Sequence, residues 1–194
     1  MASSVDNITY LTGRYVARLL ISKLPADRLY HNLHHTINVV QGVINIGNAE
    51  KVSEPEMETL LLAAWFHDVG HIKTYEGHEV ASAEIARDFL LRHDYPAERM
   101  AAVARCILAT TMPQRPESHL EEIICDADMY HLSLVTYEHA QELLREEWSR
   151  VLGKVSSDED WERENQEFLH QHHYFTHYGQ TVLQPRKEKY GLEK

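Results

Sequence analysis

Seven consecutive apolar residues, LLLAAWF from Leu60 to Phe66, limit the ways in which this chain can fold. Upstream of the run, Ser53 and Glu56 have the spacing of a capping box, and Pro55 suits the first turn of a helix. The spacing therefore predicts a helix that begins near Ser53 and includes the whole apolar run. Such a helix is apolar on all sides, so we expect it to be buried under other elements rather than to lie on the surface.

The remaining segments also have helical spacing, and no hairpin signal is present. The segment TTMPQRPES carries two prolines and is predicted to be a loop, and the polar tail QPRKEKYGLEK is expected to fray. The sequence thus predicts an all-α protein that forms a single helical bundle, with one domain over residues 1–194. Besides the buried helix, helices are expected at about 8–24, 26–48, 78–93, 96–112, 120–134, 137–152 and 158–175.

Composition and charge argue against several classes of partner. The formal net charge of −11 would repel a phosphate polymer from most of the surface, so we expect no nucleic-acid partner. A small phosphorylated ligand is still compatible, because a bound metal ion reverses the local field. No apolar run is long enough to span a membrane and no secretion signal is visible, so we expect no membrane partner and a cytoplasmic location. Cys106 and Cys125 are interpreted as reduced core thiols.

Fourteen histidines stand out, because histidine is both the commonest metal ligand and the usual acid–base residue near neutral pH. In YHNLHH, which begins at Tyr30, His31 and His35 are four residues apart and would share one helix face. Such a face suits two metal ligands, or one ligand and one proton donor, whereas His34 lies on the flanking face. The alternative is that these histidines pack within a partly buried helix.

The motif HDVGH places His67 and Asp68 at the end of the buried helix. This adjacent polar pair is costly to bury unless both side chains have partners, and a metal ion would be a partner for both. The alternative is that Asp68 interacts with the end of its own helix, which the helix dipole disfavours.

A third polar group, Asp126 and Asp128, lies inside the apolar pattern IICDADMYHL. Residues two apart on a helix point about 200° from each other, so the two carboxylates do not easily serve one site. A carboxylate among apolar residues and without a nearby arginine favours a cation. We therefore expect one of the two to face a metal ion. The alternative is that both acids are surface residues.

These motifs occur in the order H…HD…D, and the chain thereby resembles the HD-domain superfamily of metal-dependent phosphohydrolases over roughly residues 30–134. YHNLHH followed by HDVGH is also similar to the catalytic domains of cyclic-nucleotide phosphodiesterases, and DMYH resembles the last motif of dNTP-hydrolysing members. The resemblance implies a helical bundle whose motif core covers about 26–134, with C-terminal helices at about 137–185 packed on it.

The resemblance further implies a set of metal ligands: His35, His67, Asp68 and Asp128, with Asp126 as the alternate for the last position. Asp68 would also belong to the catalytic residues and would be able to bridge to a weaker second ion. A mixed set of nitrogen and oxygen ligands favours a divalent transition metal, namely Mn, Fe, Zn, Co or Ni, and Mg is compatible with the second position.

Other residues receive roles through the same resemblance. His31 would donate a proton to the leaving oxygen, and His71 would be a further catalytic residue. His78 would contact phosphate or a second metal ion, and Glu79 would orient a histidine. Lys73 would steady the phosphate, although a solvated loop lysine is the alternative.

The implied reaction is hydrolysis of a small phosphate ester, with a nucleotide as the expected substrate, and a homodimer is compatible with the sequence. An HD-type di-iron oxygenase is one alternative, but Thr110 and Thr111 occupy positions where other members often carry histidine, which favours a single fully ligated ion. A non-catalytic regulatory module that binds a nucleotide is the other alternative.

A separate cluster, His170, His173 and His177, has the spacing of one helix face. A second metal site is one interpretation of these histidines. No carboxylate occurs at matching spacing, and the neighbours are aromatic or apolar, so we favour packing against the bundle or lining of the pocket.

Overall fold

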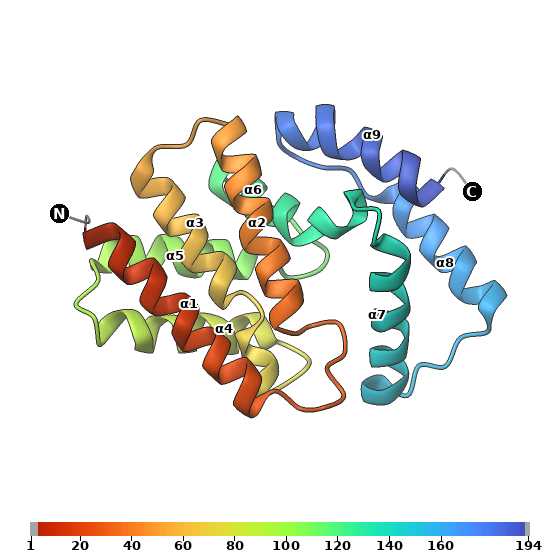
Figure 1. The fold of residues 1–194 in the computed structure, drawn as a ribbon, viewed down its shortest axis with the longest axis horizontal. Coiled ribbons are helices and arrows are strands. Elements are labelled where there is room, and N and C mark those ends of the chain that lie inside the picture. The colour runs from red at the N-terminus through yellow and green to blue at the C-terminus, as the bar shows by residue number, and fades with distance from the viewer. Residues whose placement is uncertain (1–3, 193–194) are drawn as a thin grey trace.

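The computed structural model of the protein describes residues 4–192 (Figure 1). This range is helical and contains no strand, as predicted. None of its helices is long and apolar enough to cross a membrane. The α-helices are α1 (Ser4–Lys23), α2 (Leu33–Ala49), α3 (Glu54–Phe66), α4 (His78–Leu91), α5 (Ala97–Ala109), α6 (His119–Asp128), α7 (Tyr137–Leu152), α8 (Asp158–Gln171) and α9 (Gln184–Lys187). The 3₁₀ turns η1 (Val69–Ile72) and η2 (Met129–Ser133) follow α3 and α6, and the π-helical turns η3 (Gly179–Leu183) and η4 (Glu188–Leu192) flank α9.

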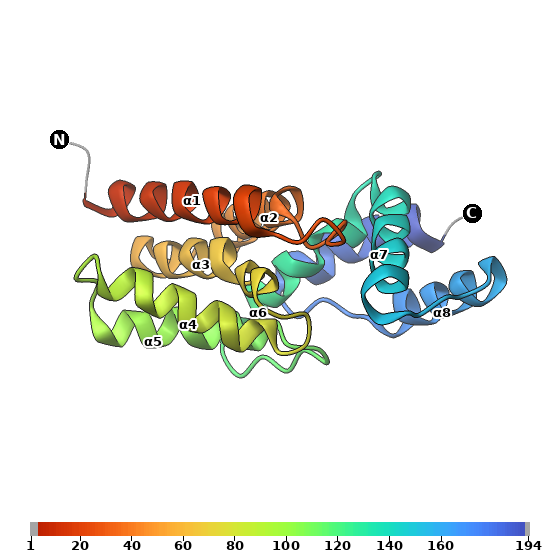
Figure 2. The same cartoon turned by 90° about the horizontal axis from the view of Figure 1, so that it is seen from below.

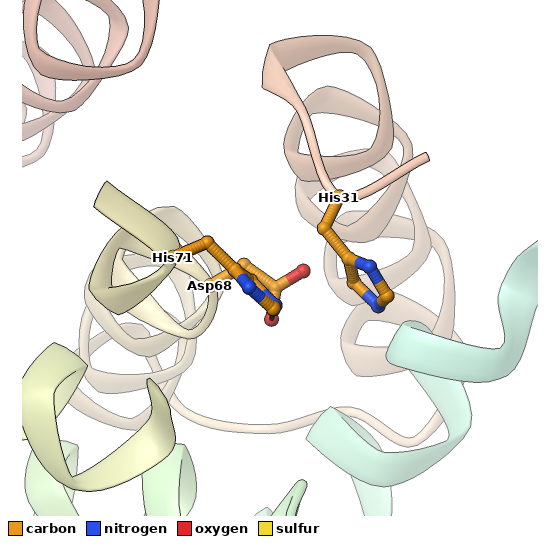
Figure 3. Close-up of side chains that lie close together, drawn as sticks. All are labelled: His31, Asp68 and His71. Atoms are coloured by element: carbon orange, nitrogen blue, oxygen red, sulfur yellow. Dashed lines mark ion pairs between the residues drawn. The ribbon is translucent and has the colours of Figure 1, made fainter. Parts of the chain in front are cut away.

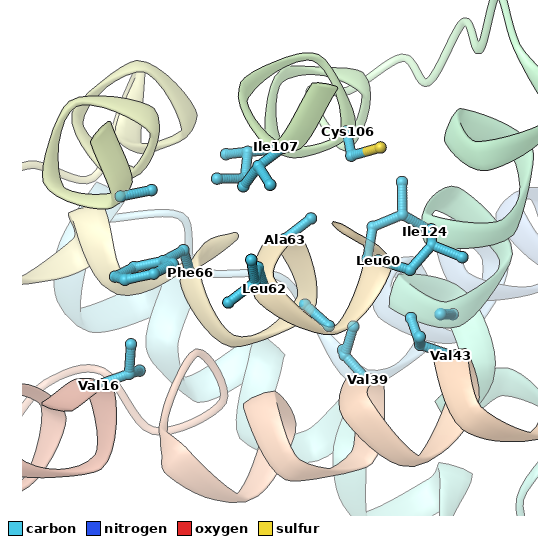
Figure 4. Packing of buried hydrophobic residues seen from close by; sticks show 14 of the residues in the cluster. Val16, Val39, Val43, Leu60, Leu62, Ala63, Phe66, Cys106, Ile107 and Ile124 are labelled. Atoms are coloured by element: carbon cyan, nitrogen blue, oxygen red, sulfur yellow. The ribbon is translucent and has the colours of Figure 1, made fainter. Parts of the chain in front are cut away.

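The helix α3 is at the centre of the bundle and packs against α1, α2, α4, α5 and α6. Five of its apolar side chains have no exposed surface: Leu60, Leu62, Ala63, Ala64 and Phe66. Figure 4 shows side chains from the neighbouring helices converging on them. The buried position expected for this helix is therefore confirmed, and it follows from an apolar surface on every side of the helix.

The helix α2 begins later than the sequence analysis predicted. It starts at Leu33 rather than near Ala26, because the Asn32 side chain caps its first turn and accepts hydrogen bonds from the amides of His34 and His35. Asparagine is among the preferred N-cap residues. The residue before it, His31, consequently lies outside the helix, so the expectation that His31 and His35 share one helix face is wrong.

The C-terminal tail is helical and packed, so the expectation that it frays is wrong within the described range. Lys187 is fully buried, and its ammonium group donates hydrogen bonds to the carbonyls of Leu169 and His172. Leu183, four residues earlier, is also fully buried. A buried lysine whose hydrogen bonds are satisfied holds this segment against α8, and the polar composition of the tail gave no sign of this.

Helices α7 and α8 lie at one end of the bundle formed by α1 to α6, as the two perpendicular views agree in showing (Figures 1 and 2). The turn η2 connects this end to α6 and contacts α2, α7 and α9. The same end carries the C-terminal end of α3 and the N-terminal end of α2, where the histidine motifs lie. The fold thereby brings α7 and α8 next to these motifs, although they are far along the chain. That the chain is a single domain stays a prediction.

Candidate metal centre and active site

Four side chains from three places in the fold meet at the end of α3: His35 on α2, the adjacent residues His67 and Asp68 after α3, and Asp128 at the end of α6. His35 Nε2 lies 3.2 Å from His67 Nε2, 3.3 Å from Asp68 Oδ2 and 3.3 Å from Asp128 Oδ1. His67 Nε2 is 3.2 Å from Asp68 Oδ2 and 3.7 Å from Asp128 Oδ1. Two ligand atoms that each lie about 2.1 Å from one ion, at a right angle, are about 3.0 Å apart. The four atoms are therefore spaced much like the ligands of a single divalent ion.

The chemistry of this group also suits a cation. A backbone carbonyl accepts only, so His67 Nδ1 donates to Ala64 O at 2.8 Å and its Nε2 lone pair faces His35. Asp68 Oδ2 is buried and receives no hydrogen bond from the described residues. Burial lowers the pKa of His35, but the carboxylates of Asp128 and Asp68 raise it more strongly, to about 10. A buried group with this much negative charge and this many inward-facing lone pairs attracts a positive ion.

Asp126 and Asp128 face different parts of the molecule. The Asp126 carboxylate accepts hydrogen bonds from the amides of Phe175 and Thr176, at 2.8 and 2.9 Å, and from the Thr176 hydroxyl at 2.7 Å. Its side chain is fully buried and turned toward the segment before η3, away from the histidines. Asp128 is the acid whose carboxylate lies in the group around His35. The expectation that the two acids point apart agrees with this geometry, and Asp126 does not occupy the alternate position.

A second group adjoins the first through Asp68. His31, Asp68 and His71 place one ligand-type atom each within 4.8 Å of the others (Figure 3). The other carboxylate oxygen, Asp68 Oδ1, lies 3.2 Å from His78 Nε2 and 4.0 Å from His71 Nε2. One oxygen of Asp68 thus faces His35 and His67, and the other faces His71 and His78. Glu79 adjoins this group, with Oε1 3.7 Å from His78 Nε2.

The histidines of the second group have opposite pKa shifts. His71 stacks against two rings, with centroids 4.5 Å from His31 and 3.8 Å from His78, and neither of its nitrogens has a hydrogen-bond partner among the described residues. Burial lowers the pKa of His71 to about 2, so its ring is neutral. Burial also lowers the pKa of His78, but Asp68 raises it more, to about 9. His71 therefore offers one free nitrogen lone pair, and His78 carries a positive charge beside Asp68.

A close backbone contact between η1 and α4 sets the position of His78 relative to Asp68. Gly70, between Asp68 and His71, donates its amide proton to Ser82 Oγ at 2.8 Å. A Cβ atom at Gly70 would lie 2.0 Å from His78 O, so only glycine allows α4 to approach η1 this closely. The approach brings His78 to Asp68.

Lys73 is not brought into this site. Its ammonium group lies 3.8 Å from Glu84 Oε2, and both side chains are more than half exposed. This agrees with a solvated loop lysine rather than with a phosphate ligand. His34 is also exposed, on the flanking side of α2. Thr110 and Thr111 line the cavity beside the metal-type groups.

Glu147 on α7 is a site residue that the sequence analysis missed. It has no exposed surface, and it accepts a short hydrogen bond from His31 Nδ1 and two more from the amides of Tyr30 and His31, at 2.8 and 3.1 Å. The Tyr75 hydroxyl donates a further hydrogen bond at 3.0 Å. A signal was present, because Glu147 lies at helical spacing in the apolar stripe that includes Leu144 and Trp148.

His131 is a second residue to which the sequence analysis gave no role. Its Nδ1 lies 3.0 Å from the Tyr30 hydroxyl and 3.2 Å from Asp128 O. Burial lowers the pKa of His131 to about 4, so its ring is neutral. The DMYH motif contained this histidine, but sequence spacing did not indicate that it would face Tyr30, 101 residues away.

A cavity of about 700 Å³ opens onto both groups. One wall carries Tyr30, His31, Asp68, His71, His78, Glu79, Asp128 and His131. The opposite wall comes from α7 and α8 and is largely apolar and aromatic. Such a mixture of convergent polar groups and apolar surface is typical of small-molecule sites.

The histidines of the C-terminal cluster do not form a site. His170, His173 and His177 are all exposed, so the expectation that they pack against the bundle or line the pocket is wrong. The helix α8 ends at Gln171, so the three residues do not share a helix face. Within residues 4–192 they belong to neither of the groups that are suited to a metal ion.

Comparison with known families gives one match. A model of the HD domain matches residues 32–133, which is just over half of the chain and includes His35, His67, Asp68 and Asp128. The match ends before α7 and α8. Comparisons with curated proteins and with solved structures give no match.

Proposed function

The chain belongs to the HD-domain family, a family of metal-dependent phosphohydrolases, and on this premise we propose that it hydrolyses a small phosphate ester, with nucleotides as the expected substrates. The observation that carries the proposal is the convergence of His35, His67, Asp68 and Asp128 beside the cavity. Four donors of this kind leave room for substrate and water at an ion.

These four residues would hold a divalent ion. The fit rests on Asp68 Oδ2, which is buried without a hydrogen bond from the described residues, and on the lone pair of His67 that faces His35. When bound, the ion would act as a Lewis acid toward a phosphoryl oxygen and would lower the pKa of a water molecule. The set of donors suits Mn, Fe, Zn, Co or Ni, and Asp68 with His71, and with His78 once it is deprotonated, would hold a second, weaker ion.

His31 is the proposed proton donor to the leaving oxygen. Glu147 accepts a hydrogen bond from its Nδ1, which fixes the orientation of the ring and leaves Nε2 for the substrate. Burial raises the pKa of Glu147, but hydrogen bonds from His31 and two backbone amides lower it more, so the carboxylate stays charged. A carboxylate behind an imidazole stabilises the protonated ring, which is the form that a general acid needs.

His78 is the proposed contact for the phosphate group, and Glu79 lies next to its ring. Its raised pKa of about 9 gives a cationic ring beside Asp68, and such a ring would contact an anionic phosphate oxygen. His71 stacks against both His31 and His78 and thereby helps to hold both rings in place. His71 therefore acts as a positioning residue in this proposal unless a second ion engages its nitrogens.

The test is phosphate release from a panel of nucleotides, cyclic nucleotides and simple phosphate esters, with Mn, Co, Ni, Zn and Mg added separately to protein treated with a chelator. The variant is Asp68→Ala, and the matched control is Asp88→Ala, an exposed acid on α4. We expect metal-dependent release by the wild type and by Asp88→Ala, and none by Asp68→Ala. No release from any ester while the wild type binds metal would contradict the proposal.

A further inference from the structure

The half of the cavity formed by α7 and α8 lies outside the residues that the family model matches. Six large apolar or aromatic side chains line this half, and we call them the aromatic lobe: Tyr137, Leu144, Trp148, Leu152, Trp161 and Phe168. Both perpendicular views place α7 and α8 at the end of the bundle where the histidine motifs lie (Figures 1 and 2). The lobe is therefore a feature of this chain's own C-terminal helices.

The aromatic lobe is continuous with the candidate active site. The Tyr30 hydroxyl meets His131 Nδ1, and the His131 ring lies 6.1 Å from the ring of Tyr137. The same cavity that the lobe lines also reaches Asp68 and Asp128. A phosphate ester bound with its phosphorus beside these two acids would extend its organic group toward α7 and α8.

The chemistry of the lobe suits a planar ring with acceptor atoms. Trp148 and Trp161 meet edge to face, with centroids 5.6 Å apart, and aromatic rings prefer such offset partners. Trp161 Nε1 can only donate, and it donates to Gln141 Oε1, which leaves the amide NH₂ of Gln141 for other acceptors. Tyr137 donates in the same way to Asn165 Oδ1. Neither NH₂ group makes a hydrogen bond to the described residues.

The charge of the cavity wall favours one phosphate group over several. Among the described residues that line it, five are acids: Asp68, Glu76, Glu79, Asp128 and Glu164. Lys154 is the one lysine or arginine among them, and its ammonium group is paired with Glu164 at 2.8 Å. Sites for polyphosphates surround the phosphate chain with lysine, arginine and metal ions. One phosphate at the metal-type groups is compatible with this wall, because Asp68 and Asp128 would face the ion there, whereas two further phosphates would lie among the remaining acids, Glu76, Glu79 and Glu164.

We propose that the aromatic lobe binds the base of a nucleotide that carries a single phosphate group, so that nucleoside monophosphates, linear or cyclic, are preferred to di- and triphosphates. The aromatic walls would stack on a nucleobase, and the two free amide NH₂ groups would donate to its acceptor atoms. The acids around the phosphate position favour a ligand with a single phosphate group. This inference rests on the function proposed above for the same site.

The first experiment measures binding to the Mn-loaded protein by isothermal titration calorimetry, with probes that resist hydrolysis so that no turnover occurs. The probes are hydrolysis-resistant analogues of nucleoside 5′-monophosphates and 3′,5′-cyclic monophosphates, and the control is the same analogue of ribose 5-phosphate, which has the sugar and the phosphate but no base. The variant Leu144→Trp fills the lobe, and Leu108→Trp on α5, outside this cavity, is the matched control. We expect at least one monophosphate to bind the wild type and Leu108→Trp about tenfold more tightly than ribose 5-phosphate, and Leu144→Trp to lose this difference.

Should Leu144→Trp not fold, as judged by circular dichroism, Leu152→Trp on the exposed rim of the lobe replaces it. Equal binding of ribose 5-phosphate and the monophosphates, or unchanged binding by the lobe variant, would overturn the inference.

The second experiment compares mono- and triphosphates of the same nucleoside by kcat/KM with the metal that best supports turnover. We expect the monophosphate to be favoured about tenfold or more. Equal or greater kcat/KM for the triphosphate would overturn the preference for one phosphate. If no ester is turned over, the proposed function fails, and calorimetry on the Mn-loaded protein with the same pair then decides the inference alone. Rapid hydrolysis of ribose 5-phosphate would support the proposed hydrolase activity but would contradict the proposed binding of a base by the aromatic lobe.

Discussion

At the scale of single residues, two aspartates separated by one alanine serve different purposes. Asp128 lies with His35 and His67, whereas Asp126 holds the backbone of Phe175 and Thr176. Asp128→Asn is expected to lower the affinity for metal at least about 100-fold, since even changes behind a ligand cost about 10–100-fold. Asp126→Asn is expected to leave metal affinity unchanged and to lower the free energy of unfolding by about 1–3 kcal/mol.

Metal titration and urea denaturation of both variants check this pair of outcomes. Loss of metal affinity in Asp126→Asn with retention in Asp128→Asn would show that the assignment is reversed. An equal loss of metal affinity in both variants would mean that metal binding depends on the structure of the C-terminal end of α6 rather than on the Asp128 carboxylate alone.

Glu147 is expected to act through His31 rather than on the substrate. Glu147→Gln removes the charge that stabilises the protonated ring, so kcat for an alkyl phosphate is expected to fall about 100-fold, within the range for acid–base groups. The loss is expected to be much smaller for p-nitrophenyl phosphate, whose leaving group needs no proton. Metal content should not change. The control is Glu146→Gln, the neighbouring exposed acid that pairs with Arg150.

The comparison of the two esters distinguishes a role of Glu147 in positioning His31 from a purely structural role of Glu147. A merely structural role would reduce turnover of both esters equally, and that result would remove His31 from its role as proton donor. A loss of the same size in Glu146→Gln would point to the helix rather than to the carboxylate.

The same residue predicts a dependence of stability on pH. The pKa of Glu147 is lowered in the folded protein below its ordinary value of 4.5, because hydrogen bonds from His31 and the backbone outweigh burial. Its contribution to stability is therefore fully present above pH 4.5 and is lost as the pH falls through the folded-state pKa. The difference in unfolding free energy between the wild type and Glu147→Gln should be largest near neutral pH and should shrink in acid. Urea denaturation over a pH series measures it; a difference that grows in acid would contradict the assignment.

At the scale of elements, the start of α2 determines where two of the site histidines lie. Asn32 caps this helix, so His35 falls in its first turn and His31 stays in the preceding loop, within reach of Glu147. Asn32→Ala is expected to lower the free energy of unfolding by about 0.5–2 kcal/mol, whereas Asn32→Asp, which keeps the cap acceptor and loses only the hydrogen bond that Nδ2 donates to Leu29 O, should cost less. Thermal or urea denaturation checks the ranking, and equal losses in the two variants would contradict the role of the cap.

The elements differ in how far their sequence predicts them. The position of α3 follows from local signals, a capping box and a run of apolar residues, and both are visible in one segment. The start of α2 depends on which of several polar residues becomes the cap, and the sequence analysis placed this start near Ala26, six residues before the observed cap at Asn32. The packed tail depends on Lys187, whose hydrogen-bond acceptors Leu169 and His172 belong to another segment.

At the scale of the whole molecule, the resemblance to the HD-domain family, carried by the order H…HD…D, implied which residues meet. In the structure each motif lies at an end of α2, α3 or α6, and these ends share one side of the bundle. The contribution of α7 could not be predicted in this way. Glu147 lies 116 residues from His31, and only the packing of α7 against the loop before α2 brings the two together. The aromatic lobe likewise exists only because α7 and α8 face the histidine motifs across a cavity.

The central claim is that His35, His67, Asp68 and Asp128 together hold a divalent ion. The most direct test is anomalous diffraction from crystals of the full chain soaked in Mn²⁺, which locates the ion without reference to activity. The account predicts an anomalous peak whose nearest protein atoms are His35 Nε2, His67 Nε2 and one carboxylate oxygen each from Asp68 and Asp128. A peak elsewhere in the molecule, or no peak at this position at saturating Mn²⁺, would contradict it.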